Sequence, residues 1–448
     1  LTLYHEKFKD LPVAFAPARL RDTLGELVSR AGLRQLRISE SEKFAHVTFF
    51  LDGGSHLALH GKDECCIPSP KGIPFDQHPA MNLPDVTRNL IHGIEQAYDL
   101  IVANFANGDV IGHTSSCDAK VRCAEIIDHH LGIVVEKAMA ADYVILITAD
   151  HGNLEVMLTP EGSPHVAHTT NPVPFLLIDP HKPSSIELRE GGQLACIAPT
   201  MLKVLDLAQP KAMSGSNLAL HHDWGGRRRI LLLILDGWGI GKVDPTNPIF
   251  LAETPHWDRL LDRFSSTRLS ASGEAVGLQP GKSGNSEAGH MNIGAGRIVI
   301  QDDVRLDQAM KDGSFSSNEI LDKTIRDVKE RKKKLHLIGL LTEKSSHGSI
   351  DYPLKVLQMA KDMGLEDVYL HVIFDGRSTE PGSAPDLLEK LERQMDAIGT
   401  GQIASGVGRG IALDRDGNYA RTQKAYEAMV LGIGNLYCPK GVSDARGV

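Results

Sequence analysis

Residues 230–239 read ILLLILDGWG, an unbroken aliphatic run that stops at Asp236. Six consecutive Ile and Leu residues predict a short strand buried on both faces, as in the parallel sheets of α/β proteins. A carboxylate directly after such a strand would be costly to bury without a partner. The stretch therefore predicts a parallel sheet with a charged group at the carboxyl end of one strand, and we expect a cation beside it.

Further apolar runs alternate along the chain with stretches of helical period, which favours an α/β fold with largely parallel sheets. Several of them are followed directly by Asp, His, Gly or Asn. Ligands of open α/β sheets gather at the carboxyl ends of strands, so we look for chemistry there. We predict strands at Ala45–Leu51, Leu100–Asn104, Tyr143–Thr148, Val173–Ile178, Ile230–Leu235, Leu335–Leu340 and Val368–Phe374.

The amino-acid composition is that of a globular protein and excludes several other classes. The chain has 448 residues with 48 basic and 57 acidic ones, a net charge of −9, and 42% of its residues are hydrophobic. Such a chain can build two or three globular domains, and no run approaches the roughly 20 apolar residues of a membrane-spanning helix. The acidic balance excludes a broad basic surface for nucleic acid.

Six cysteines without CxxC spacing indicate reduced thiols. The first residue is Leu1 and no signal-peptide pattern follows, so we expect a processed or trimmed cytoplasmic chain.

Three polar motifs supply candidate metal ligands. Asp109 and His113 are four residues apart, so one helical turn would place both on one face. Asp150 and His151 end a predicted strand, and His168 precedes another. Taken singly, each motif could equally be a solvated loop pair or a hydrogen-bonded loop histidine. Taken together the donors are oxygen and nitrogen without thiolate, which favours one or two ions of Mn, Zn, Co or Mg over an iron–sulfur or structural zinc site. The set comprises Asp109, His113, Asp150, His151, His168 and Asp236.

Ser286 is the candidate nucleophile. It stands in the stretch GNSEAGH at 284–290, where glycines flank the serine at the start of a predicted helix. A helix N-terminus favours an anion such as a phosphate group. A plain N-cap serine explains the same pattern, but a hydroxyl near metal ions could ionise and attack.

Six long motifs resemble, one after another, those of cofactor-independent phosphoglycerate mutase, a family of the alkaline phosphatase superfamily. They are LLLILDGWGIG at 231–241, GKSGNSEAGHMNIGAGR at 281–297, SEKFAHVTFFLDGG at 41–54, ANFANGDVIGHTS at 103–115, ITADHGNLE at 147–155 and VAHTTNPVPF at 166–175. The resemblance implies an alkaline phosphatase-like domain with a substrate domain. It also implies that Asp109, His113 and His168 hold one metal, whereas Asp150, His151, Asp236 and the nucleophile Ser286 hold the other.

The resemblance further implies the reaction and its partners. The family interconverts 3-phosphoglycerate and 2-phosphoglycerate in glycolysis and gluconeogenesis through a phosphoserine, with two divalent metals and no 2,3-bisphosphoglycerate. Mn is the metal we expect first, with Mg, Co or Zn as alternatives. We expect a monomer whose partner is a small-molecule substrate, without nucleic acid or membrane. The residues that match family substrate contacts are Lys43, His347, Arg377, Arg409 and Arg415. A metal-dependent phosphohydrolase and a catalytically silent metal-binding scaffold stay open as alternatives.

The order of the motifs departs from the family. Family proteins begin with the strand that carries Asp236, so HHDWGGRRR at 221–229 joins their last segment to their first, as in a circular permutation. We therefore expect a metal-binding domain at 17–299 and a substrate-binding domain at 300–448, completed by 1–16. A family segment with two further arginines has no match, TEKSSHGS at 342–349 replaces a Gly-rich loop, and Ser378 stands where the family has Asp.

Overall fold

The computed structural model describes residues 6–8, 10–16, 20–182, 186–343, 348–376, 379–380, 382–414 and 417–434. The chain divides into two compact units, one of Ala18–Gln301 and one of Leu1–Pro17 with Asp302–Val448. Each unit has its own hydrophobic core. Of the helices in the described part of the chain, none is both long enough and apolar enough to cross a membrane.

The unit Ala18–Gln301 is built on an eight-stranded sheet in the order β2-β1-β3-β9-β4-β5-β10-β7. Its strands β2, β1, β3, β9 and β4 are parallel to one another, whereas β5 is antiparallel to both β4 and β10. The strands are Lys62–Ile67 (β2), Gln35–Glu40 (β1), Leu100–Phe105 (β3), Arg229–Leu235 (β9), Tyr143–Thr148 (β4), Val173–Ile178 (β5), Ser265–Ser270 (β10) and Gly192–Gln193 (β7). A two-stranded ribbon pairs Glu187–Leu188 (β6) with Ala219–Leu220 (β8).

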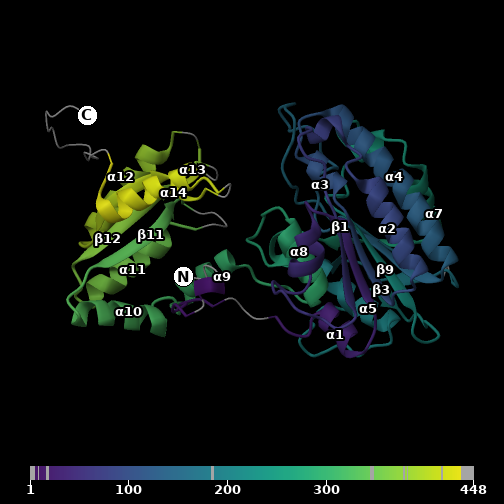
Figure 1. Ribbon diagram of the computed structural model, residues 1–448, viewed down its shortest axis with the longest axis horizontal. Coiled ribbons are helices and arrows are strands. Elements are labelled where there is room, and N and C mark those ends of the chain that lie inside the picture. Colours follow the sequence, from purple (N-terminus) through teal and green to yellow (C-terminus); the bar gives the residue numbers. More distant parts are fainter. Residues whose placement is uncertain are drawn as a thin grey trace. The chain divides into compact units, whose positions relative to one another are not determined.

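Helices cover both faces of this sheet (Figure 1). The helices α2 and α4 lie over one face, with α7 against α4, and α1, α5 and α8 lie on the other side. Every residue of β9 from Ile230 to Leu235 is buried, as expected for a central strand. The helices are Leu24–Arg30 (α1), Leu83–Glu95 (α2), Asn107–Gly112 (α3), Cys117–Ala140 (α4), Ile197–Val204 (α5), Pro248–Leu251 (α6), Pro255–Arg263 (α7) and Ser286–Ala295 (α8).

The second unit carries a parallel three-stranded sheet in the order β11-β12-β13. Its core joins apolar side chains of the sheet to those of α10, α11 and α12. The strands are Leu335–Leu341 (β11), Val368–Phe374 (β12) and Gln402–Gly408 (β13), and the helices are Asp302–Asp312 (α9), Glu319–Glu330 (α10), Asp351–Asp362 (α11), Ala384–Ile398 (α12), Arg409–Ala412 (α13) and Tyr419–Tyr426 (α14). The predicted α/β class with two mainly parallel, helix-flanked sheets is confirmed.

The strand predicted at Ala45–Leu51 is wrong, because this run forms a wide helical turn at His46–Phe50 (η2). Val47 and Leu51 are fully buried and stand four residues apart, which is a helical and not a strand spacing. The Thr48 hydroxyl donates to the carbonyl of Phe44 at 2.7 Å, one turn back. Short apolar runs do not distinguish a buried strand from a buried helical turn, and β1 already occupies the place beside β3.

Seven strands escaped the sequence prediction, namely β1, β2, β10, β13 and the two-residue strands β6, β7 and β8. In β1 all six residues are buried, yet four of them are polar or charged. Their polar side chains hide the hydrophobic pattern. The joint expected at 221–229 lies inside the first unit, where it connects β8 to β9.

The last residue of β1 is a buried acid. Glu40 accepts a hydrogen bond from the backbone N–H of Asn82 at 2.9 Å, while its second carboxylate oxygen has no hydrogen-bond partner among the described residues. Burial raises the pKa of Glu40 from 4.5 to about 7, although hydrogen bonds from Asn82 and Ser69 oppose the shift. The folded chain thus holds this proton more tightly than the unfolded chain.

We expect Glu40→Gln to flatten the pH dependence of stability. Because the folded pKa is raised, the parent loses free energy of unfolding as the pH rises from about 4.5 to about 7. The neutral amide cannot ionise, so the variant should gain stability relative to the parent at pH 8 and much less at pH 5. Urea unfolding at the two pH values measures this, with the exposed Glu190→Gln as control. An equal effect at both pH values would contradict the assignment.

The turn after β9 requires glycine. Gly237 has a φ of +75°, and a Cβ atom there would lie 2.8 Å from the Cα atom of Asp109 on α3. Its carbonyl accepts hydrogen bonds from the N–H groups of Asn153 and Leu154 at 3.0 and 2.9 Å. Three loops from the carboxyl edge of the sheet therefore meet at one backbone position.

Replacing Gly237 by Ala should destabilise the chain more than the same change at Gly162. Gly162 has a similar φ of +82° but no atom within 4 Å of the added methyl group. The left-handed conformation alone costs about 1–2 kcal/mol, which is the effect we expect at Gly162. At Gly237 the clash with Asp109 should bring the loss to about 2–5 kcal/mol. Urea unfolding of both variants isolates the clash, and equal losses would refute it.

Candidate metal and phosphoryl-transfer site

The predicted ligands converge at the carboxyl edge of the large sheet. Asp236 follows β9 directly, and Asp150 and His151 come after β4. Asp109 lies on α3, just beyond β3, and Lys43 follows β1. Since β1, β3, β9 and β4 are parallel neighbours, their carboxyl ends lie side by side and bring together residues far apart in the sequence.

Asp109, His113 and His168 form the first group. The Nε2 atoms of His113 and His168 lie 3.3 and 3.1 Å from Oδ1 of Asp109 and 3.0 Å from each other. The Nδ1 atoms of the same rings lie 2.8 Å from the carbonyls of Val166 and Gly284. A neutral imidazole that donates from Nδ1 presents a lone pair at Nε2, so two lone pairs and a carboxylate oxygen face one point. That arrangement suits a cation.

Asp150, His151, Asp236 and Ser286 form the second group. The Oγ atom of Ser286 is 2.9 Å from Nε2 of His151 and 3.3 Å from Oδ1 of Asp236. The His151 Nε2 atom also lies 3.5 Å from Asp150 and 3.6 Å from Asp236. Asp150 Oδ2 is buried, and ring nitrogens of His151 and His290 lie 3.5 and 3.3 Å from it without a well-formed hydrogen bond. A buried carboxylate oxygen held this loosely suits a cation.

The charge balance of the two groups also favours bound cations. Oxygen atoms of Asp109 and Asp236 lie within 4.8 Å of each other, as do those of Asp150 and Asp236. Burial and the charge of Asp150 raise the pKa of Asp236. Burial opposes ionisation of Asp109 too, but the Lys43 ammonium holds the pKa of that carboxyl well below its usual range. One lysine faces three carboxylates, so the donor set fits divalent metal ions with their additional charge.

Lys43 links both groups. Its Nζ donates to Asp109 at 2.6 Å, to Asp236 at 2.8 Å and to the Oγ atom of Ser286 at 2.5 Å. Burial disfavours the ammonium form, but the surrounding carboxylates outweigh burial and raise the pKa of Lys43 above its ordinary value. In the metal-free chain Lys43 is therefore a cation and a hydrogen-bond donor and not a base.

Ser286 is the first residue of α8, and the preceding residue forms the cap. The Asn285 side chain accepts a hydrogen bond from the N–H of Ala288 at 2.8 Å. Gly289 allows the helix to approach β4, because a Cβ atom there would lie 2.5 Å from the carbonyl oxygen of Asp150. The serine hydroxyl thus stands at a helix N-terminus whose partial positive charge favours a phosphate group. The N-cap role that competed with catalysis belongs to Asn285.

Three polar residues of the cluster were missed by the sequence analysis. His290 stands four residues after Ser286, and its Nδ1 atom lies 3.3 Å from Oδ2 of Asp150. The amide of Asn104 donates to Asp236 at 2.6 Å, and that of Asn153 donates to Oδ1 of Asp109 at 2.7 Å. The four-residue spacing from Ser286 could have revealed His290. The asparagines end or follow strands without any distinguishing pattern.

Of the predicted substrate contacts, Lys43 lies among the candidate metal ligands of the first unit, and Arg409 lies in the second unit. Arg409 forms an ion pair with Asp375 at the carboxyl ends of β13 and β12. Both line a cavity of about 300 Å³ with Leu341, Phe374 and Thr379 among its walls. Asp375 was not predicted, although it directly follows a predicted strand. His347, Arg377 and Arg415, like Ser378, lie outside the described residues.

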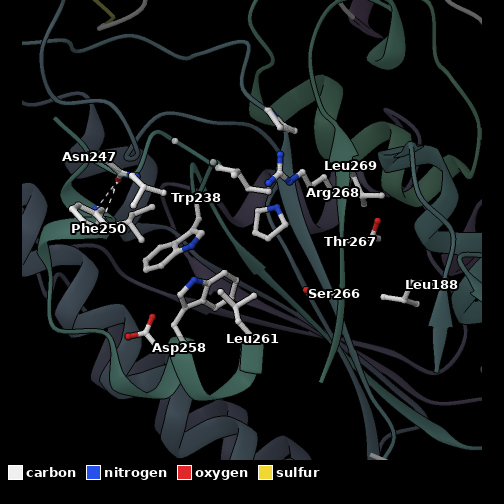
Figure 2. Close-up of a pocket in the computed structure, with 18 of the residues that line it drawn as sticks. Leu188, Trp238, Asn247, Phe250, Asp258, Leu261, Ser266, Thr267, Arg268 and Leu269 are labelled. Atoms are coloured by element: carbon white, nitrogen blue, oxygen red, sulfur yellow. Dashed lines mark hydrogen bonds between the residues drawn. The ribbon is translucent and has the colours of Figure 1, made fainter. Parts of the chain in front are cut away.

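A larger cavity of about 1150 Å³ lies in the first unit and contains none of the predicted ligands. Figure 2 shows Trp238 and Leu261 on one side of it and Arg268 and Leu269 of β10 on the other. Trp238 packs edge-on against Trp257, with ring centroids 5.5 Å apart. The larger volume therefore does not coincide with the candidate site, which is marked by the convergence of charged side chains.

Comparison with known proteins supports the motif analysis. A family model described as the Metalloenzyme superfamily matches residues 13–209, and one described as BPG-independent PGAM N-terminus matches residues 306–445. The 2,3-bisphosphoglycerate-independent phosphoglycerate mutase of Clostridium botulinum is 46% identical over 220 residues, which cover 49% of this chain and 43% of the relative. The protein of the same name from Syntrophotalea carbinolica is 47% identical over 220 residues, 49% of this chain and 42% of its own.

The chain spans less than half the length of these curated relatives. A crystal structure of Leishmania mexicana phosphoglycerate mutase at low cobalt concentration is similar with a TM-score of 0.44 and 24% identity, over 49% of this chain and 43% of that one. One stretch of the chain matches a metalloenzyme family and another the N-terminus of BPG-independent phosphoglycerate mutase, so the resemblance to cofactor-independent phosphoglycerate mutase that the motifs predict is confirmed.

Proposed function

We propose that this chain is a metal-dependent phosphoglycerate mutase that interconverts 3-phosphoglycerate and 2-phosphoglycerate through a phosphoserine on Ser286. The observation that carries the proposal is the place of the Ser286 hydroxyl, within 2.5 to 3.3 Å of Lys43, His151 and Asp236 and at the N-terminus of α8. A hydroxyl that lies beside the Lys43 ammonium, at a helix N-terminus and among candidate metal ligands, is suited to accept a phosphoryl group. The names of the curated relatives support the same reaction.

We assign two divalent metal ions to the cluster, with Asp109, His113 and His168 holding one. Asp150, His151, Asp236 and Ser286 would hold the other. Bound there, the ions would neutralise charge on the transferring phosphoryl group and lower the pKa of the serine hydroxyl. Mn is the ion we propose, with Mg, Co or Zn as alternatives, and the oxygen and nitrogen donors support this class of metal. No 2,3-bisphosphoglycerate is needed, in keeping with the name of the relatives.

The chain's own residues position the transfer. The hydroxyl of Ser286 loses its proton as a bond forms between its Oγ atom and phosphorus, while the bond from phosphorus to the glycerate oxygen breaks. The glycerate oxygen takes up one proton as it leaves, so no net proton is gained or lost. Lys43 holds the serine oxygen and two ligands in one geometry through its three hydrogen bonds. The reverse transfer to the other hydroxyl yields the isomeric ester, so glycerate must be retained between the two steps.

In this proposal the second unit holds the glycerate between the two transfer steps. We assign metal binding to residues 17–299 and substrate binding to residues 300–448 with 1–16. Arg409 fits a carboxylate or phosphate, since its guanidinium is oriented by Asp375. We propose His347, Arg377 and Arg415 as further substrate contacts. Lys43 would contact the phosphoryl group. No similarity found favours a phosphohydrolase or a silent scaffold over the mutase.

The pathway, the cellular location, the oligomeric state and the absence of macromolecular partners are also part of the proposal. We place the reaction in glycolysis and gluconeogenesis, in the cytoplasm, and expect a monomer that binds neither nucleic acid nor membrane. The net charge of −9 supports the lack of a nucleic-acid partner.

Metal analysis tests the two-ion assignment. A metal-loaded sample should approach two transition-metal ions per chain, and Asp109→Ala should lower that content, because its carboxylate lies in two of the candidate ligand groups. The exposed Asp262→Ala serves as control and should match the parent. Elemental analysis after exhaustive dialysis gives the number. The assignment fails if the parent binds no metal under loading conditions.

Ser286→Ala should abolish phosphoryl transfer and leave the fold intact, because the loss of one hydroxyl costs little packing volume. Incubation of the parent with labelled phosphoglycerate and peptide mapping should place the label on the peptide that holds Asn285 and Glu287. Circular dichroism and an exposed-serine control, Ser266→Ala, separate chemistry from folding. A label on histidine would overturn the phosphoserine route, and free phosphate as the main product would favour the phosphohydrolase.

A further inference from the structure

A fully buried lysine lies behind the loop that carries His168. Lys120 stands in the first turn of α4 and has no exposed surface. The helix otherwise buries mainly apolar side chains, such as Ala124, Ile127 and Leu131. Burying an ammonium in such surroundings costs free energy unless a polar partner compensates. The partner therefore indicates what the lysine does.

That partner is the backbone of the loop. The Nζ atom of Lys120 donates to the carbonyl oxygen of His165 at 2.5 Å, the one hydrogen bond of this ammonium among the described residues. Burial lowers the pKa of Lys120 to about 8, and the charges of Cys117 and Glu155 oppose the shift. The lysine is thus a cation directed from the core of the first unit at a surface loop.

The loop has few buried contacts of its own. Pro164, Val166 and Ala167 are exposed, and 43% of the Val166 surface is accessible. Hydrogen bonds of backbone groups hold the loop at its two ends. The first is His165, whose N–H donates to the carbonyl of Met157 at 2.9 Å while its carbonyl accepts from Lys120. The second is Thr169, whose N–H donates to the carbonyl of Gly152 at 2.9 Å. Exposed loops held only by hydrogen bonds open readily, so each anchor matters.

The segment between the anchors orients two imidazoles. The carbonyl of Val166 accepts from Nδ1 of His113 at 2.8 Å, and His168 itself places Nε2 3.1 Å from Asp109. A shift of this segment would turn both rings away from the carboxylate. Groups that orient a ligand through its second nitrogen change metal affinity without touching the metal.

We infer that Lys120 is a positioning residue, whose buried ammonium fixes residues 165–169 so that His113 and His168 face Asp109 before a metal ion binds. The inference rests on the proposed function, because that proposal makes these residues metal ligands. A lysine that merely filled space would be replaceable by methionine, which has a similar length and no donor.

Lys120→Met separates the two roles. Methionine fills the same space and removes the cost of burying a charge, so the melting temperature should stay equal or rise. In the metal-free chain, amide hydrogen exchange at residues 165–169 should nevertheless become at least about tenfold faster. Cys123→Ala is the matched control, since Cys123 is a buried residue one turn further along α4. Its loop should exchange at the parent rate.

Titration with Co²⁺ alone gives the second readout. Affinity at one of two sites should fall about 10–100-fold in Lys120→Met, while the other keeps the parent value. Lys120→Arg restores a cationic donor and should recover part of the loss. Unchanged exchange and unchanged Co²⁺ affinity in Lys120→Met would overturn the inference, and so would equal weakening of both sites with a lower melting temperature. A parent that binds no Co²⁺ would defeat the proposed function instead, and loop exchange alone would then decide the anchoring role.

Discussion

Mutual repulsion among Asp109, Asp150 and Asp236 is the constraint on which the site depends. These carboxylates are buried at the carboxyl edge of one sheet, where water cannot screen them. Lys43 is the cation that the chain supplies at their centre, and its three hydrogen bonds tie two of them to the serine hydroxyl. A protein gains nothing in stability from such a cluster by itself. The arrangement becomes favourable when divalent ions complete it, which is why the geometry points to metal chemistry.

The architecture around the cluster follows from that need. Parallel strands bring their carboxyl ends to one edge, so four loops from distant parts of the sequence can each contribute a charged side chain. The approach of these loops depends on residues without side chains, as at Gly237, whose missing Cβ atom leaves room for Asp109. The rigid strands thus fix the positions of the ligand side chains, and glycine in the turns lets the loops that carry them approach one another.

Polar groups that hydrogen-bond to the candidate ligand side chains fix the orientation of those side chains. Backbone carbonyls of Val166 and Gly284 hold the outer nitrogens of His113 and His168, and Lys120 supports the loop from which one of these carbonyls comes. Glu155 accepts from the N–H groups of Asn153 and Gly239 at 2.7 and 3.2 Å and so joins two ligand-bearing loops. Such supporting contacts decide how well a metal site is organised before the ion arrives.

The sequence by itself determined the α/β class, the central strand that ends at Asp236 and the residue types of the site, because periodicity and local motifs are properties of neighbouring residues. It misjudged Ala45–Leu51, since a short apolar run fits a buried helical turn as well as a strand, and it missed β1, because four of its six buried residues are polar or charged. Only the tertiary structure decided which donors meet. The pairing of Lys43 with Asp236 spans 193 residues, and the burial of Lys120 against His165 has no local signature. Convergence of distant loops depends on strand order, which no local pattern encodes.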